Sequence, residues 1–96
     1  MSGLEDIEKI LKKHKELLRE RFFVEKIGVF GSYSRGEETP ESDVDILVEL
    51  FEPLGWEFFD LKEYLEEILA KKVDLGTENA IRPQLRDKIL KEVIYV

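Results

Sequence analysis

The sequence contains no cysteine and only one histidine. The absence of cysteine excludes disulfides, thiol catalysis and thiolate-bound metals. A single histidine excludes a histidine-rich zinc site and makes histidine-based acid–base catalysis a poor candidate. No apolar run approaches the roughly 18 residues of a membrane span, and the first ten residues carry acids where a signal peptide has an apolar block. We therefore expect a cytoplasmic protein with no membrane partner.

Positive charge is also scarce, with 15 basic against 22 acidic residues and a net charge of −7. A general binder of nucleic acid backbone needs a broad basic face, so direct contact with nucleic acid is not expected. With 96 residues and 43% hydrophobic content, the chain can build one core, which predicts a single domain over residues 1–96. More than half of the acids fall between residues 37 and 70. They indicate either a cation-binding centre or a solvated acidic loop and helix.

Hydrophobic spacing predicts a chain in which helices and strands alternate. The expected elements are a helix over 4–21, a strand over 24–30, a helical turn over 33–36, an exposed loop over 37–42, a strand over 43–50, a helix over 56–71, a strand over 72–75 closed by Gly76, and a last helix capped by Asn79 with Pro83 in its first turn. The final residues either fray or add a short strand. The unit from 43 to 75 should be a right-handed crossover between parallel strands, whereas the strand over 24–30 could pair in either direction. The expected fold class is α/β (α+β), a small mixed sheet with helices mainly on one face.

Asp43 and Asp45 are the first candidate site residues. At positions i and i+2 of a strand they point the same way, about 6–7 Å apart. Two like charges on one strand face repel each other and are costly to desolvate, and a divalent cation such as Mg²⁺ would relieve both costs. The alternative is that both aspartates are solvated at the strand start or cap the preceding loop.

Asp74 adds a third carboxylate, in the short strand KVDL. In a three-stranded sheet it can stand one strand spacing, about 5 Å, from the strand that carries Asp43 and Asp45. Carboxylates converging from two strands can hold two Mg²⁺ ions about 3.5–4 Å apart. Glu49 lies on the same face as the aspartates but about 13 Å from Asp45, and we interpret it as a rim residue.

Gly31 and Ser32 follow the first strand at a tight turn. Glycine permits a close backbone approach there, and the following amides and the Ser32 hydroxyl can donate to phosphate oxygens. Arg35, one helical turn later, adds a guanidinium suited to terminal phosphates. Each feature alone also fits an ordinary turn or a surface charge.

The stretch GSYSRGEETPESDVD combines Gly-Ser, ten residues and Asp-x-Asp. It resembles the signature of the polymerase-β-type nucleotidyltransferase superfamily. The small size, the flanking VFGSYSRG and SDVDILVEL, and the later VDL resemble the minimal nucleotidyltransferases, whose members include MntA-type antitoxins paired with toxins of the HEPN class.

The resemblance implies a role for each matching residue. Asp43 and Asp45 would each ligate two Mg²⁺ ions, and Asp74 would ligate the one that activates the attacking hydroxyl. Gly31 and Ser32 would hold the outer phosphates of ATP, with Arg35 assisting. The implied activity is that of a protein adenylyltransferase, which moves AMP from ATP to a tyrosine of a cognate HEPN RNase toxin. Larger relatives append acceptor-binding domains that we do not expect here, so a partner would bring the acceptor.

Two other functions stay open. The first alternative is a catalytically weak antitoxin that neutralises its partner by steric contact, for which an acidic surface would suit a basic RNase. The second and less favoured alternative is nucleotidyl transfer to a small molecule. Trp56, Phe58 and Phe59 are expected mainly to pack in the core, although one exposed aromatic could anchor a partner or stack on adenine.

Overall fold

The computed structural model describes residues 3–96, which form helices and strands around one mixed sheet. The elements are α1 (Gly3–Lys13), α2 (Lys15–Phe22), β1 (Val24–Phe30), α3 (Ser32–Arg35), β2 (Val44–Leu50), α4 (Glu57–Leu69), β3 (Val73–Thr77), the 3₁₀ turn η1 (Glu78–Ala80), α5 (Pro83–Glu92) and β4 (Ile94–Tyr95). The strand order is β3-β2-β1-β4. β2 and β3 run parallel, as predicted, and β1 is antiparallel to both of its neighbours.

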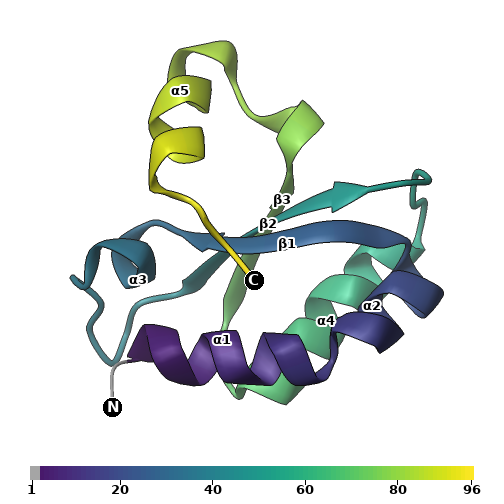
Figure 1. Ribbon diagram of the computed structural model, residues 1–96, viewed down its shortest axis with the longest axis horizontal. Coiled ribbons are helices and arrows are strands. Elements are labelled where there is room, and N and C mark those ends of the chain that lie inside the picture. The colour runs from purple at the N-terminus through teal and green to yellow at the C-terminus, as the bar shows by residue number, and fades with distance from the viewer. Residues whose placement is uncertain (1–2) are drawn as a thin grey trace.

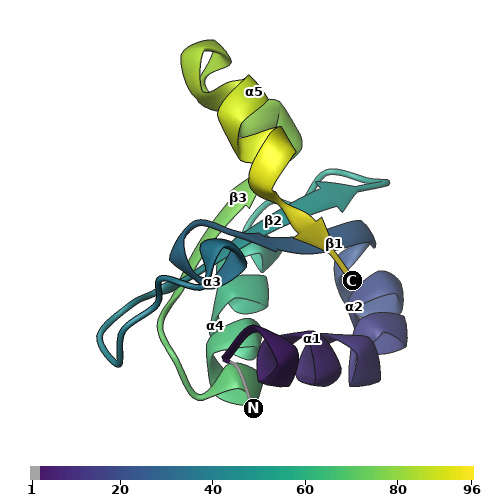
Figure 2. The ribbon, with the colours of Figure 1, turned by 60° about the vertical axis from the view of Figure 1, so that its left-hand side comes forward.

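Helices α1, α2 and α4 cover one face of the sheet, and α5 stands on the other (Figure 1; Figure 2). The predicted mixed sheet with helices mainly on one face is therefore confirmed. The arrangement follows from the alternation in β2, where Val44, Ile46 and Val48 share one face and are fully buried. From α4, Leu61 and Leu65 pack into the same core. No helix within residues 3–96 combines the length and the apolar character needed to cross a bilayer.

The single helix predicted over residues 4–21 is wrong, because the structure divides it at His14. His14 has φ −103° and ψ 7°, which lies outside the helical region. Its ring Nδ1 lies 2.9 Å from the carbonyl oxygen of Ile10, which its own backbone N–H also approaches at 3.2 Å. A side chain that bonds the local backbone competes with the regular helical ladder. The hydrophobic stripe passes through the break without a shift, so its spacing does not reveal it.

The end of β3 and the start of α5 also differ from the prediction. Gly76 does not close the strand, because β3 keeps pairing with β2 as far as Val48↔Thr77. Asn79 lies in η1 and does not cap α5. Arg82 precedes α5 in an extended conformation, and Pro83 is the first helical residue, as expected. A residue before proline is driven out of the helical region, which makes Arg82 the natural boundary.

The aromatic residues at the start of α4 are less buried than predicted. The exposed fraction is 85% for Trp56 and 64% for Phe59. Phe58 is half-buried, and its ring packs edge-on against Phe59 with the centroids 6.5 Å apart. The expectation that these aromatics mainly pack in the core is therefore wrong for Trp56 and Phe59, which both face solvent.

We predict that Leu65→Ala lowers the free energy of unfolding by about 3 kcal/mol, because it leaves a cavity at a fully buried position of α4. Phe59→Ala, six residues earlier on the same helix, should change it by less than about 0.5 kcal/mol. Urea denaturation followed by circular dichroism measures both. Equal losses in the two variants would contradict this placement of α4.

Candidate active site

Asp45 and Asp74 lie side by side across the parallel pair β2 and β3. The sheet register pairs Asp45 with Asp74, so their Cα atoms are one strand spacing apart, about 4.8 Å. The expected proximity of the two strands' aspartates is confirmed. The register itself follows from burial, because Val44↔Val73 on one side of this pair turns both valines into the core.

The two carboxylates repel each other strongly. The pKa of Asp45 is raised to about 6, first by burial, then by the charge of Asp74 and a side-chain hydrogen bond with it, and further by the charges of Asp43 and Glu92. The raised pKa means that the ionised form of Asp45 is disfavoured at this position. A bound cation would relieve that repulsion directly.

Asp43 does not form a three-carboxylate cluster with this pair, although its charge still acts on Asp45. It lies one residue before β2, where it lines a shallow hollow with Ser42 and Lys72. Across residues 3–96, no three side chains of the His, Cys, Asp and Glu types are grouped closely enough to form a ready metal site. Three carboxylates without a neutralising charge repel one another, which favours their separation. The ligand chemistry nevertheless fits Mg²⁺, because carboxylate oxygens are the hard ligands that this ion prefers. The Asp45 carboxylate also lies beside that of Asp74, and a cation would offset their two charges.

Gly31 brings the turn after β1 into contact with the aspartate pair. Its φ of 72° is a conformation that favours glycine, and a Cβ at this position would overlap Asp45 Oδ2. The antiparallel register sets Phe30 opposite Asp45, so the turn begins at the level of the carboxylates. The structure thus brings Gly31 and Asp45 together, and any side chain at position 31 would push the carboxylate away.

The turn that follows is held by its own hydrogen bonds. Ser34 Oγ and the backbone N–H groups of Ser34 and Arg35 all donate to the carbonyl oxygen of Gly31, at 2.9, 3.1 and 3.2 Å. Ser32 begins α3 and is half-buried. Tyr33 is buried in the core. The buried Tyr33 side chain and the bonds to the Gly31 carbonyl oxygen hold the short helix α3 in place, and this helix carries Ser32 and Arg35.

Arg35 is engaged by two glutamates. Its Nε donates to Glu37 Oε1 at 2.9 Å, and its Nη1 lies 3.1 Å from both carboxylate oxygens of Glu92. Glu92 Oε2 also accepts the backbone N–H of Gly31 at 2.8 Å. No motif or spacing marks Glu92, which is 61 residues from Gly31, and sequence reasoning missed it. Only the return of α5 and β4 to the sheet brings it here.

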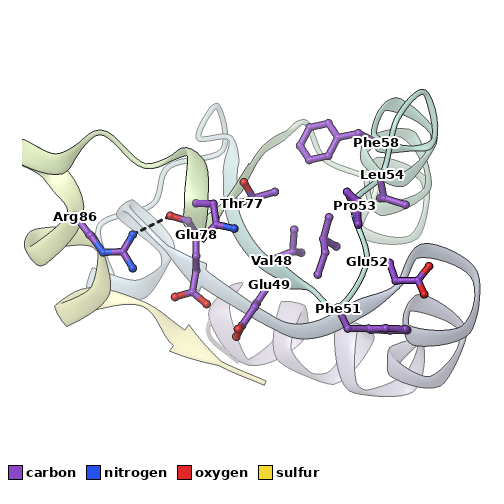
Figure 3. Close-up of a pocket in the computed structure, with 12 residues that line it drawn as sticks. Val48, Glu49, Phe51, Glu52, Pro53, Leu54, Phe58, Thr77, Glu78 and Arg86 are labelled. Carbon is purple, nitrogen blue, oxygen red and sulfur yellow. Dashed lines mark hydrogen bonds between the residues drawn. The ribbon is translucent and has the colours of Figure 1, made fainter.

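A cavity of about 470 Å³ lies at the C-terminal ends of β2 and β3, whereas the aspartates lie near the N-terminal ends of these strands (Figure 3). Val48 and Thr77 line it, each three residues or about 10 Å beyond the aspartate of its strand. Arg86 reaches in from α5 and donates to the carbonyl oxygen of Glu78 at 3.1 Å. Glu49 lines this cavity and pairs with Lys26 at 3.7 Å. The cavity does not coincide with the aspartate pair, where the perturbed carboxyl group lies.

A small mixed sheet with carboxylates on adjacent strands, facing a glycine turn that offers hydrogen-bond donors, is the arrangement of an enzyme that handles phosphorylated substrates. Residues 8–96 match the family described as the nucleotidyltransferase domain. The chain belongs to that family and is a nucleotidyltransferase.

Individual relatives extend over the whole chain. It is 50% identical over 97 residues to the protein adenylyltransferase MntA of Thermococcus cleftensis, covering 100% of this chain and 98% of that protein. A solved structure described as a minimal nucleotidyltransferase has a TM-score of 0.81 at 34% identity, covering 98% of this chain and 95% of the other. The crystal structure of a toxin–antitoxin with AMP-PNP has a TM-score of 0.73 at 28% identity, covering 88% of this chain and 69% of the other.

We predict that Asp45→Asn raises the free energy of unfolding in metal-free buffer by about 1–2 kcal/mol at pH 7, because it removes a charge that burial and the neighbouring Asp74 both disfavour. The folded pKa of about 6 exceeds the ordinary 3.8, so the wild type loses stability as the pH rises between these values. The difference between variant and wild type should therefore vanish near pH 4 and be complete at pH 7. Denaturant unfolding at several pH values measures it.

The matched control is Asp87→Asn on the exposed face of α5, which removes the same charge away from the pair. Its effect should stay within about 0.5 kcal/mol at every pH. An Asp45→Asn variant less stable than wild type at pH 7 would contradict the repulsion.

Proposed function

We propose that this chain is a Mg²⁺-dependent protein adenylyltransferase that acts as an antitoxin, moving AMP from ATP to a tyrosine of a cognate HEPN-type RNase toxin. The observation that carries the proposal is the Asp45–Asp74 pair set against the Gly31 turn. It is supported by the protein adenylyltransferase MntA at 50% identity over nearly full lengths, and by the toxin–antitoxin structure with AMP-PNP.

In this proposal Asp43, Asp45 and Asp74 hold two Mg²⁺ ions. The chemistry magnesium supplies when bound is a lower pKa for the attacking hydroxyl and neutralisation of the leaving pyrophosphate. Gly31 and Ser32 donate to the outer phosphates of ATP, and Arg35 adds a positive charge beside them.

The reaction is an in-line displacement at the α-phosphorus. The tyrosine oxygen forms a bond to that phosphorus while the bond from it to the bridging oxygen of the β-phosphate breaks. Pyrophosphate leaves with the bonding electrons, and the hydroxyl proton passes to Asp74. Most of the acceleration comes from alignment and from charges already in place, which a domain of this size can supply.

We predict that the wild-type protein, given ATP labelled at the α-phosphate, Mg²⁺ and its partner toxin, transfers label to the toxin. Asp45→Asn should lower the transfer rate by at least about a hundredfold, because it removes a carboxylate that the proposal assigns to both Mg²⁺ ions. Autoradiography of the separated proteins, with mass spectrometry of the toxin peptides, measures transfer and identifies the acceptor.

Asp87→Asn is the control and should transfer label at the wild-type rate. Binding of each variant to the toxin is measured in parallel. A double Asp43→Asn, Asp45→Asn variant that binds and fully neutralises the toxin without labelling it would overturn transfer as the basis of neutralisation and favour steric contact.

We further predict that Mg²⁺ and ATP together stabilise the wild-type protein, raising its melting temperature by about 4–8 °C at ligand concentrations well above Kd. The reason is that the cation cancels the repulsion between Asp45 and Asp74, which the unfolded chain does not experience. Differential scanning fluorimetry with and without EDTA measures the shift. A melting temperature indifferent to millimolar Mg²⁺ and ATP would contradict a nucleotide–metal site at this pair.

A further inference from the structure

Glu92 occupies the hydrogen-bond donors that the proposed function assigns to phosphate. Its Oε2 accepts the Gly31 N–H at 2.8 Å, and both of its oxygens lie 3.1 Å from Arg35 Nη1. The Glu92 side chain is only 17% exposed, against 42% for Arg35. A carboxylate held by a backbone N–H and a guanidinium is bound as a phosphate oxygen pair would be. Glu92 is therefore an anion belonging to the chain itself, placed where a ligand anion would bind.

The two anions cannot use these donors together. A single N–H directs its hydrogen toward one strong acceptor, so a phosphate oxygen at Gly31 requires that Glu92 move away. Glu92 also adds negative charge beside Asp45 and is one of the groups that raise its pKa. A triphosphate entering with Glu92 in place would meet repulsion from that carboxylate as well as from the aspartates.

The structure allows Glu92 to leave at low cost. It is the last residue of α5, and every residue of that helix is at least partly exposed. Figure 2 shows α5 projecting away from the sheet. The helix is tied down at its end by Val93, which packs over Gly28, and by the pairing of β4 with β1. A rotation of the Glu92 side chain, or a small tilt of α5, would free both donors without opening the core.

We propose that Glu92 is an internal competitor of the nucleotide: its carboxylate holds the Gly31 N–H and Arg35 in the free protein and is displaced by the triphosphate. This inference rests on the proposed function. Glu92 thereby sets the affinity for nucleoside triphosphate and for pyrophosphate, which present the same polyphosphate oxygens, and it takes no part in the bond changes at the α-phosphorus.

The test measures equilibrium binding of Mg²⁺ with a non-hydrolysable ATP analogue, and of Mg²⁺ with pyrophosphate, by isothermal titration calorimetry. Glu92→Gln keeps the side-chain size and removes the charge, and Glu92→Ala removes the competing group altogether. Both variants should bind the two ligands about five- to tenfold more tightly than wild type, the scale of one partly screened charge interaction. Glu63→Gln, exposed on α4 across the sheet, makes the same chemical change and should leave affinity unaltered.

Two further readouts separate competition from a merely structural role. The KM for ATP should fall by the same factor in Glu92→Gln, with kcat within about twofold of wild type. In ¹⁵N-edited NMR spectra of the wild type, the Gly31 amide resonance should shift on adding the Mg²⁺–analogue complex, and it should already be shifted in free Glu92→Gln.

Each outcome decides a different claim. Unchanged or weaker binding in both Glu92 variants, with wild type binding normally, overturns the competition and leaves the proposed function standing. A fall in kcat at unchanged affinity would make Glu92 part of the reacting centre and would equally overturn it. If folded wild type and all variants fail to bind either ligand, the proposed function itself is refuted, and the competition with it.

Discussion

The site depends on one constraint, the parallel pairing of β2 with β3 in the register that sets Asp45 beside Asp74. The hydrophobic core imposes this register, because a slip of either strand by one residue would turn the buried valines of that strand outward. The aspartates cannot move apart without breaking that pairing. Burial and the charge of Asp74 together raise the pKa of Asp45, and the free energy of the core offsets the cost of this arrangement. A domain of this size can hold two acids together only where burial elsewhere offsets the cost.

Around this pair the molecule balances charges of both signs. Gly31 lets the Asp45 carboxylate lie against the turn because it has no side chain. The same residue offers its N–H to Glu92, which also engages Arg35. Carboxylate acceptors from Asp45 and Glu92 thus lie beside the Gly31 turn, where the Gly31 N–H is a hydrogen-bond donor. A magnesium–triphosphate complex carries matching charges, with cations for the aspartates and an anion for the Gly31 N–H and Arg35. In the proposed function, the Glu92 carboxylate would occupy part of the place of such a ligand.

Local pattern reasoning succeeded where periodicity and burial agree. The strand–helix–strand unit predicted the parallel pair of β2 and β3. It failed where a single residue or a contact with a distant segment decides where a helix or strand ends. The break at His14 appears in the φ and ψ of that one residue and leaves the hydrophobic spacing intact. The extension of β3 through Gly76 comes from pairing with β2, which outweighs the weak strand preference of glycine.

The sequence by itself determined the chemical groups and their order: a Gly-Ser turn after one strand, two aspartates at the start of the next and a third on the strand after the crossover. These follow from spacing of two residues along a strand and from turn chemistry, which are local properties. Only the tertiary structure decided that Asp74 meets Asp45 while Asp43 remains apart, and that Glu92 returns from the end of α5 to the Gly31 turn. Such contacts depend on sheet register and on the path of α5 and β4, which arise from burial summed over the whole chain and leave no mark in any short segment.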